Sequence, residues 1–279
     1  MKKNLFLFPV LFSVMAGGAA NAGQESLPAI YHLLFNKQAP PPPFVQPLND
    51  TGITWGGNYP SGNNSGCTGE EIGAQDCSHG RDKTHNDNSD GHAGFSFIKL
   101  DANGAALVNQ AADYATTPWN CVEDKVTGLT WEVKTANGGL HDQDDTYTWY
   151  NTNSATNGGA NGAANPAGGT CEGYTSGNAA TYCNTQAYVA RVNAVGWCGK
   201  SDWRMPTVEE LIGIVAFDRS WPSIDTAYFP NTPSDSVVWS GSPLAFISDV
   251  AWYVNFNIGY SNDFERSYSG QVRLVRGGQ

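Results

Sequence analysis

The chain has 279 residues, of which 26 are acidic and 15 are Lys or Arg, so its formal net charge is −11. Nucleic acid and phosphate groups are themselves anionic, and this acidity therefore argues against them as the main partners. The sequence also has no Gly-x-Ser-x-Gly elbow, His-Glu-x-x-His zinc motif or phosphate-binding loop, so we expect no enzyme of those classes.

The first 22 residues have the features of a secretory signal peptide. Lys2 and Lys3 precede an apolar run from Leu5 to Met15, and Ala20-Asn21-Ala22 supplies small residues for cleavage. A signal anchor is the alternative, but the run is shorter than the about 20 residues that span a membrane. Cleavage leaves 13 basic and 26 acidic residues, a net charge of −13. We expect an exported protein (periplasmic, cell-surface or extracellular) with no integral membrane segment after cleavage.

Two segments precede the main domain. Residues 23–47 form a Pro-rich leader or linker, in which the four prolines 40–43 favour an extended polyproline II spacer. Residues 48–118 are rich in Gly, Asn, Asp and Ser, with strand-like pieces at Gly52–Trp55 and Phe95–Leu100. We interpret residues 48–118 as a small β-rich subdomain, followed by the main domain over residues 119–279.

Six cysteines lie in the exported part, and an even count in an oxidising compartment predicts three disulfides. Sequence alone allows 15 pairings. We predict Cys67 with Cys77 and Cys171 with Cys183, since each closes a short loop, which leaves Cys121 with Cys198. Zinc is the alternative, but no Cys-x-x-Cys pair is present to begin a ligand set.

Two acidic segments concentrate the oxygen ligands that calcium prefers. The first does not match an EF-hand, because it lacks a Glu at the twelfth position and flanking helices. A polar surface loop is the alternative interpretation of both, and no other cofactor is expected. The candidate calcium ligands are Asp82, Asp87, Asn88 and Asp90 in the first segment and Asp142, Asp144 and Asp145 in the second.

Two helices are predicted in the main domain. Pro206 ends the preceding segment and Thr207 with Glu210 has the spacing of a capping box. The apolar stripe from Val208 to Ala216 predicts one buried face for this helix. The other helix spans Thr185 to Val195, between a cap at Asn184 or Thr185 and a stop at Gly196. We expect its Ala187, Ala190 and Val195 to face the core, with Tyr188 or Val192 at the margin.

The C-terminal part alternates strands with polar, aromatic loops. Strands are predicted at residues 129–133, 237–240, 250–257 and 271–276, which with the two helices makes an α+β domain. In the third of these strands Trp252, Val254 and Phe256 should face the core. The loops mix Tyr and Phe with Asn, Ser and Asp, as antibody loops do. The candidate ligand-binding residues are Phe246, Tyr253, Asn255, Asn257, Tyr260, Asn262, Asp263, Phe264, Arg266 and Tyr268.

The run from Cys198 to Thr207 (CGKSDWRMPT) resembles the signature of the Lcl C-terminal domain family, the terminal domain of a bacterial collagen-like adhesin. The resemblance extends over about residues 119–279, through Cys121–Val133, Thr146–Tyr150 and Gln271–Arg276. It implies a C-type-lectin-like fold with two helices and a mostly antiparallel sheet. Some lectin-like domains of this type are targets of diversity-generating retroelements, and Phe246–Tyr268 would be the diversified region. The collagen-like stalk is missing, so trimerisation does not carry over and the oligomeric state stays open.

These observations predict an exported, adhesin-like protein that binds a glycan or a surface protein through its C-terminal loops. Sulfated glycans would be repelled by the net charge unless Arg266, Arg273 and Arg276 form a local basic patch. One alternative is a structural envelope component without a discrete ligand. The other is a glycan-active hydrolase that uses Glu132 with an aspartate such as Asp142 or Asp225.

Overall fold

The computed structural model describes residues 48–277 except 59–61, 69–72, 74, 86–87, 167–169 and 236. The predicted signal peptide and the Pro-rich segment lie outside the described residues. The described residues belong to one compact unit, which spans Gln46–Gln279. In this part of the chain, no helix has both the length and the hydropathy needed to cross a membrane.

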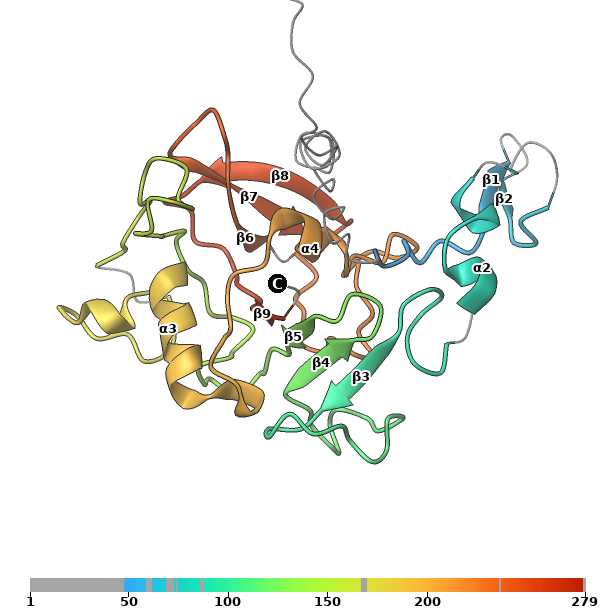
Figure 1. Cartoon of the computed structure of the whole chain (residues 1–279), viewed down its shortest axis with the longest axis horizontal. Coiled ribbons are helices and arrows are strands. Elements are labelled where there is room, and N and C mark those ends of the chain that lie inside the picture. The colour runs from blue at the N-terminus through green and yellow to red at the C-terminus, as the bar shows by residue number, and fades with distance from the viewer. Residues whose placement is uncertain are drawn as a thin grey trace, which may run out of the picture. The chain divides into compact units, whose positions relative to one another are not determined.

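The described strands form three antiparallel sheets (Figure 1). A small sheet pairs β1 (Gly56–Asn58) with β2 (Gly62–Asn64). The second sheet has the order β3-β4-β5-β9 and the third has the order β6-β7-β8. Their strands are β3 (Phe97–Leu100), β4 (Cys121–Asp124), β5 (Thr130–Glu132), β9 (Val275–Arg276), β6 (Val237–Pro243), β7 (Val250–Asn255) and β8 (Tyr260–Glu265).

Helices are short and few among the described residues. They are α2 (Asp82–His85), α3 (Thr185–Val195) and α4 (Val208–Ile212), with 3₁₀ turns at Asp76–Ser78, Ala179–Thr181 and Trp197–Gly199. The predicted α+β class is confirmed. The polar segment at β8 was expected to be a loop, and its pairing with β7 makes it a strand instead.

Two apolar clusters hold the main sheets together. The first combines Phe97 and Trp131 of the four-stranded sheet with Leu211 of α4 and Val254 of β7. The second contains Trp239 of β6 together with Tyr188 and Val192 of α3. Together they account for most of the buried aromatic area, which is the main favourable term in folding a domain of this size.

The four-stranded sheet extends across the domain boundary that was expected between residues 118 and 119. β3 belongs to the region expected to be a separate subdomain, yet it pairs with β4, with Phe97 opposite Asp124. Phe95 and Phe97 are buried in the first apolar cluster. A boundary between residues 118 and 119 would therefore divide one sheet and one core, so residues 95–118 belong to the main domain.

The segment Trp203–Leu211 connects three parts of the fold. The Trp203 N–H donates to Asn193 of α3 at 2.8 Å, and Arg204 makes two backbone hydrogen bonds with Val275 of β9. The Arg204 guanidinium makes a bidentate ion pair with Glu210, at 2.8 and 2.7 Å. The motif therefore fixes α3, α4 and β9 relative to one another within this unit.

The predicted capping box begins α4. The Thr207 hydroxyl accepts from the Glu210 N–H at 3.2 Å, and the Glu210 carboxylate accepts from the Thr207 N–H at 2.8 Å. The helix is shorter than expected and ends at Ile212, because Gly213 follows and Ala216 bonds to Ser223 outside the helix. Val215 and Ala216 are nevertheless buried, so the apolar stripe predicted burial correctly but not helix length.

Substitution of the cap is expected to have a moderate effect. Thr207→Ala removes the acceptor for the Glu210 N–H and should lower the free energy of unfolding by about 1 kcal/mol. Thr207→Ser keeps the hydroxyl and should stay within a few tenths of a kcal/mol of the original chain. Urea unfolding of the three proteins measures both values, and equal losses in the two variants would show that the cap does not stabilise α4.

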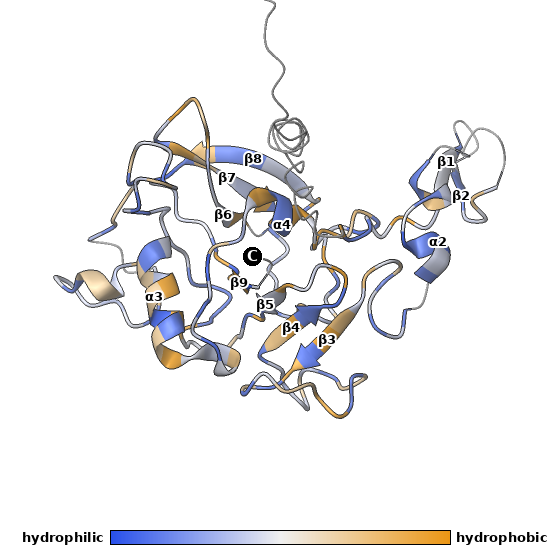
Figure 2. Ribbon diagram, viewed as in Figure 1, coloured by the Kyte–Doolittle hydropathy of each residue, from blue (hydrophilic) through white to orange (hydrophobic). Residues whose placement is uncertain are grey.

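The helix α3 has the predicted bounds and caps. The Asn184 side chain accepts from the Ala187 N–H, and Gly196 ends the helix in the left-handed conformation with φ 67°. Figure 2 shows hydrophobic and hydrophilic bands alternating along this ribbon. The buried face differs from the prediction: Tyr188 and Val192 are fully buried, whereas Ala190 and Val195 are exposed. The helix turns its larger side chains inward because they fill the space beside Tyr147 and Trp203.

Candidate functional site

Four aromatic side chains gather on one face of the β7–β8 hairpin. Tyr253 in β7 lies opposite Asn262 in β8, and antiparallel partners directly opposite each other point to the same face. Side chains two residues apart on a strand also share a face, so Tyr260 and Phe264 lie there as well. Their rings are 6.4 and 6.3 Å from the Tyr253 ring, and Tyr268 lies 4.5 Å from Phe264. We call Tyr253, Tyr260, Phe264 and Tyr268 the aromatic surface.

The aromatic surface has one buried ring and three exposed ones. Tyr260, Phe264 and Tyr268 are 41%, 44% and 42% exposed, whereas Tyr253 is 6% exposed. Burial and the neighbouring Tyr260 hydroxyl raise the pKa of Tyr253 to about 12. β8 lies at the edge of its sheet, with β7 as its neighbour in the described structure. The inner strands are covered by core side chains and β8 is not, which leaves these rings accessible.

Polar candidates flank the aromatic rings unevenly. Asn255 and Asn262 share the face of Tyr253, and the Asn255 amide donates to the Tyr260 hydroxyl at 3.4 Å. Asp263 lies on the opposite face of β8 because side chains alternate. Asn257 lies in the turn between the strands, where its carbonyl accepts from the Trp221 N–H at 2.7 Å. The hairpin thus presents two of these polar residues beside the rings.

Phe246 is highly exposed, at 83%, on the loop between β6 and β7. That loop reaches the same end of the hairpin as Phe264, because Val250 pairs with Glu265 and the Arg266 N–H donates to Asp249. Trp252 is only half-buried, whereas Val254 and, just after the strand, Phe256 are fully buried. Ala251 and Tyr253 on the opposite face of β7 are buried as well, so both faces of this strand contact the core.

Arg266 was predicted to contact ligand, and the structure corrects this. Its side chain is 1% exposed, its Nε donates to the Val250 carbonyl at 3.1 Å, and Nη1 donates to the Ala160 carbonyl. The guanidinium also lies 4.0 Å from the Trp149 ring centroid. Because its donors hold the 158–162 loop against β7, Arg266 has a structural position and no ligand-facing surface.

The basic patch considered for sulfated glycans does not form. Arg273 is buried, where it donates to the Glu132 carbonyl at 2.7 Å and to the Thr232 hydroxyl at 2.8 Å. Arg276 makes an ion pair with Asp202 at 2.7 Å. With Arg266 also buried, the three arginines do not create a positive surface.

A cavity of about 470 Å³ lies between the 150–156 loop and the beginning of α3. Tyr150, Asn151, Asn153 and Gln186 supply polar lining, and Val189 is among its apolar lining residues. Sequence reasoning missed this cavity and treated the Asn-rich segment as a plain loop. The signal was present in the spacing of Asn151, Asn153 and Asn157, since asparagines in such loops form side-chain turns with the backbone two residues ahead.

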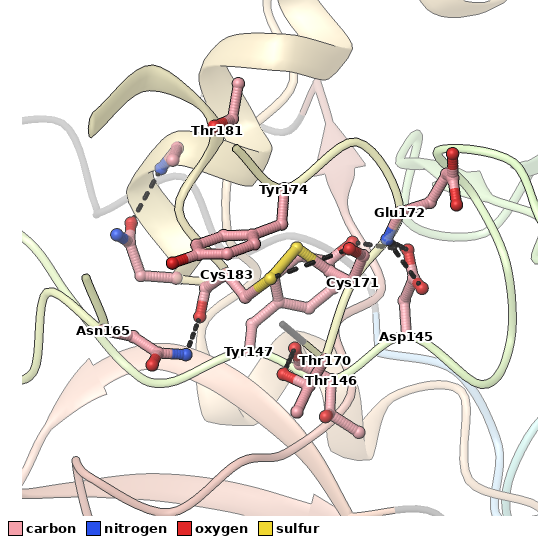
Figure 3. Close-up of a disulfide and its surroundings, with 12 residues drawn as sticks. Asp145, Thr146, Tyr147, Asn165, Thr170, Cys171, Glu172, Tyr174, Thr181 and Cys183 are labelled. Carbon is pink, nitrogen blue, oxygen red and sulfur yellow. Dashed lines mark hydrogen bonds between the residues drawn. A yellow bond between two sulfur atoms is a disulfide. The ribbon is translucent and has the colours of Figure 1, made fainter. Parts of the chain in front are cut away.

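The long polar loop is tied as predicted. The Cys171–Cys183 disulfide forms and packs with Tyr147 and Tyr174, as Figure 3 shows. The other two disulfides also pair as predicted, Cys67 with Cys77 and Cys121 with Cys198. Each cross-link restricts the unfolded chain.

The acidic residues proposed for calcium are used within their own loops. Asp142 accepts from the N–H groups of Gly138 and Asp144 at 2.6 and 2.9 Å. Both oxygens of Asp145 accept from the Glu172 N–H at 3.1 Å. In the described part of the chain, no group of three or more His, Cys, Asp or Glu side chains is placed to hold a metal ion. In the second segment, Asp142 and Asp145 are thus hydrogen-bonded to backbone N–H groups.

Residues of the first acidic segment also form hydrogen bonds within the protein. Asp82 is buried, and its N–H donates to Asp50 at 2.8 Å. Burial and the nearby Asp50 carboxylate raise the pKa of Asp82. Asn88 accepts from the Ala93 N–H and Asp90 accepts from the Ser96 hydroxyl, while Asp87 lies outside the described residues. These contacts shape the turn that precedes β3.

A fully buried ion cluster surrounds Glu132 in β5. Lys134 Nζ lies 3.1 Å and His141 Nδ1 lies 2.8 Å from Glu132 Oε1, and the Tyr188 hydroxyl donates to the same oxygen. The Leu274 N–H donates to Oε2 at 2.8 Å. Hydrogen bonds therefore reach both carboxylate oxygens, as a buried charge requires.

The partners of Glu132 set its ionisation. Burial on its own raises the pKa of this carboxyl, but Lys134, His141 and Tyr188 outweigh that effect and hold the pKa well below its usual range. Burial lowers the pKa of Lys134. Glu132 has no exposed surface through which a glycosidic bond could reach it, and Asp225 is hydrogen-bonded to the His92 and Ala227 N–H groups.

Comparison with protein families agrees with the sequence motif, whereas the other comparisons found no match. No curated protein and no solved structure matches the chain. The family model of the Lcl C-terminal domain matches residues 120–276, which is more than half of the chain. That range contains the aromatic surface, the cavity beside α3 and the ion cluster around Glu132. The chain therefore belongs to the Lcl C-terminal domain family.

Proposed function

We propose that this protein is an exported, adhesin-like module that binds a glycan or a surface protein through the aromatic surface. The observation that carries the proposal is the grouping of Tyr260, Phe264 and Tyr268 on an uncovered sheet edge. Exposed clusters of large aromatic side chains are uncommon on the surface of a protein without partners, and they mark interaction sites.

The chemistry of the surface suits recognition. Tyr and Phe supply rigid contact area with few rotatable bonds, and each ring can stack against a sugar or fill a pocket on a protein. Asn255 and Asn262 supply adaptable hydrogen-bonding groups on the same face. The buried Tyr253 supports the exposed rings from below and fixes their positions.

The family membership and the disulfides support the proposal of an exported, adhesin-like protein. Membership of the Lcl C-terminal domain family relates the chain to bacterial surface and adhesin proteins. Three disulfides in the described residues fit an exported protein, because such bonds persist in oxidising compartments. Family membership, the disulfides and the aromatic surface are all consistent with a protein that binds a partner outside the cytoplasm.

Array binding tests the proposal. The exported protein and a triple variant (Tyr260→Ser, Phe264→Ser, Tyr268→Ser) would be applied to glycan and surface-protein arrays. Exposed aromatic anchors each contribute about 1 to 2 kcal/mol to a typical interface, so the triple variant should lose at least about 100-fold in affinity. The class of array that gives the signal identifies the ligand as glycan or protein.

A matched control distinguishes binding by the aromatic surface from nonspecific hydrophobic binding. Phe217 is 42% exposed and lies outside the aromatic surface. Phe217→Ser should bind like the original protein. Equal binding by the triple variant would contradict the proposal. Absence of binding, together with a homo-oligomer that buries Tyr260 and Phe264, would favour the structural alternative.

A further inference from the structure

We propose that the cavity between the 150–156 loop and α3 is a binding site for one neutral sugar residue. Its volume of about 470 Å³ is within the range of small-molecule sites, which is about 300 to 1,000 Å³. None of the residues that line it belongs to β7 or β8. The inference therefore concerns a second surface and does not rest on the proposed function.

The polar wall of the cavity is preorganised. The Asn151 side chain accepts from the Asn153 N–H at 2.9 Å, and the Asn153 side chain accepts from the Ala155 N–H at 3.1 Å. The Thr152 N–H and hydroxyl both donate to Gln186 Oε1, at 2.8 and 3.0 Å. Successive side-chain turns and a link to α3 thus hold the Asn- and Thr-containing 150–156 loop in one conformation, which lowers the entropy that binding must overcome.

The same contacts determine which atoms stay free for a ligand. Gln186 Oε1 accepts two hydrogen bonds, which distinguishes this oxygen from the amide nitrogen. Nε2 has no partner among the described residues. Asn153 Oδ1 is likewise occupied, and its Nδ2 has no partner in the described structure. The Tyr150 hydroxyl also has no intramolecular partner among the described residues. Two amide donors and one phenol therefore line the cavity, as the hydroxyl groups of a sugar require.

The charge and apolar lining define the ligand class further. Among the described residues that line the cavity, Arg204 is the one side chain of Lys, Arg, His, Asp or Glu type. Its guanidinium is already committed to Glu210 and to the Gly277 carbonyl. Val189 and Met205 add apolar contact. Because no free charge faces the cavity, a neutral sugar fits better than a sulfated or carboxylated one.

Saturation-transfer and titration NMR with monosaccharides test the site. The probes are glucose, galactose, mannose and N-acetylglucosamine, with glucuronic acid as a charged comparison. For about 12 to 15 non-hydrogen atoms, ordinary ligand efficiency gives a dissociation constant near the millimolar range. We expect saturable binding of at least one neutral sugar and weaker binding of glucuronic acid.

Isosteric variants connect binding to the cavity. Asn153→Asp and Gln186→Glu keep the oxygens that accept from the loop but remove the free NH₂ donors. Each should weaken sugar binding at least about tenfold. Asn109→Asp is the matched control, since Asn109 caps the Ala111 N–H in the same way on another surface. Thermal unfolding of all three variants checks that the fold is retained.

The outcomes are distinct. The assignment would be overturned if no neutral sugar bound saturably, or if glucuronic acid bound more tightly than the neutral sugars. It would also be overturned if Asn153→Asp and Gln186→Glu bound the sugar as tightly as the original protein does. The Tyr260, Phe264 and Tyr268 triple variant should bind the monosaccharide unchanged. Failure of the cavity site and failure of the aromatic surface are therefore separately visible.

Discussion

Replacement of both Cys121 and Cys198 by Ala is expected to lower the free energy of unfolding by about 4.5 kcal/mol. The disulfide spans 77 residues, and the chain-entropy relation gives this magnitude for a loop of that length. Both cysteines are buried in the second apolar cluster, and the bond joins β4 to the turn after α3. Small domains have total stabilities of about 5 to 15 kcal/mol, so the variant should be near its folding threshold.

The short Cys67–Cys77 disulfide provides the comparison. It spans 10 residues, for which the same relation gives about 2.7 kcal/mol. Urea unfolding of the two double-alanine variants measures both losses under one set of conditions. A larger loss for Cys67→Ala with Cys77→Ala than for the long cross-link would contradict the entropic explanation.

Glu132→Gln is expected to destabilise the fold by about 3 to 5 kcal/mol, the cost of removing one member of a buried ion pair. The substitution leaves Lys134 and Arg273 buried without the carboxylate that offsets their charge. It also removes the negative charge to which Tyr188 and His141 are hydrogen-bonded. Chemical unfolding at neutral pH measures the loss.

The pH dependence of this loss follows from the low pKa of Glu132. A carboxyl with a depressed pKa in the folded state stabilises the protein above its unfolded pKa of about 4.3, and this contribution disappears as pH falls through the folded pKa. The stability difference between the original chain and Glu132→Gln should therefore be largest above about pH 5 and shrink in acid. A difference that grows as pH falls would contradict the described ionisation.

Glu123→Gln is the control on the neighbouring strand. Glu123 lies in β4, its side chain is 40% exposed, and its ion pair with Lys125 is loose at 3.9 Å. Exposed pairs of this kind contribute about 0 to 1 kcal/mol. A loss comparable to that of Glu132→Gln would mean that the effect does not come from burial.

Local rules predicted those parts of the fold that depend on nearby residues. The capping box at Thr207, the stop at Gly196 and the two short disulfides each involve positions that are close in sequence. The long disulfide then followed from the even count. These features could be predicted because turn chemistry and loop closure involve few residues.

Features that depend on distant partners were harder to predict. β8 has the polar sequence YSNDFE, which is typical of a loop, and it becomes a strand because β7 lies beside it. In the sequence, Arg266 has the features of a surface residue. In the structure it is buried, because Trp149 and the Ala160 carbonyl lie against its guanidinium. The cavity beside α3 depends on a loop that reaches across to Gln186. In each case a contact between residues far apart in the sequence decides the outcome.

Amide hydrogen exchange of the ligand-bound protein locates the surface that binds the ligand. The ligand identified on the array would be added, and exchange would be compared with that of the free protein along the whole chain. We expect protection concentrated in β8 and the segment that follows it, residues 260–268, because Tyr260, Phe264 and Tyr268 of the aromatic surface lie there. Protection confined to other segments, with residues 260–268 unchanged, would contradict this expectation.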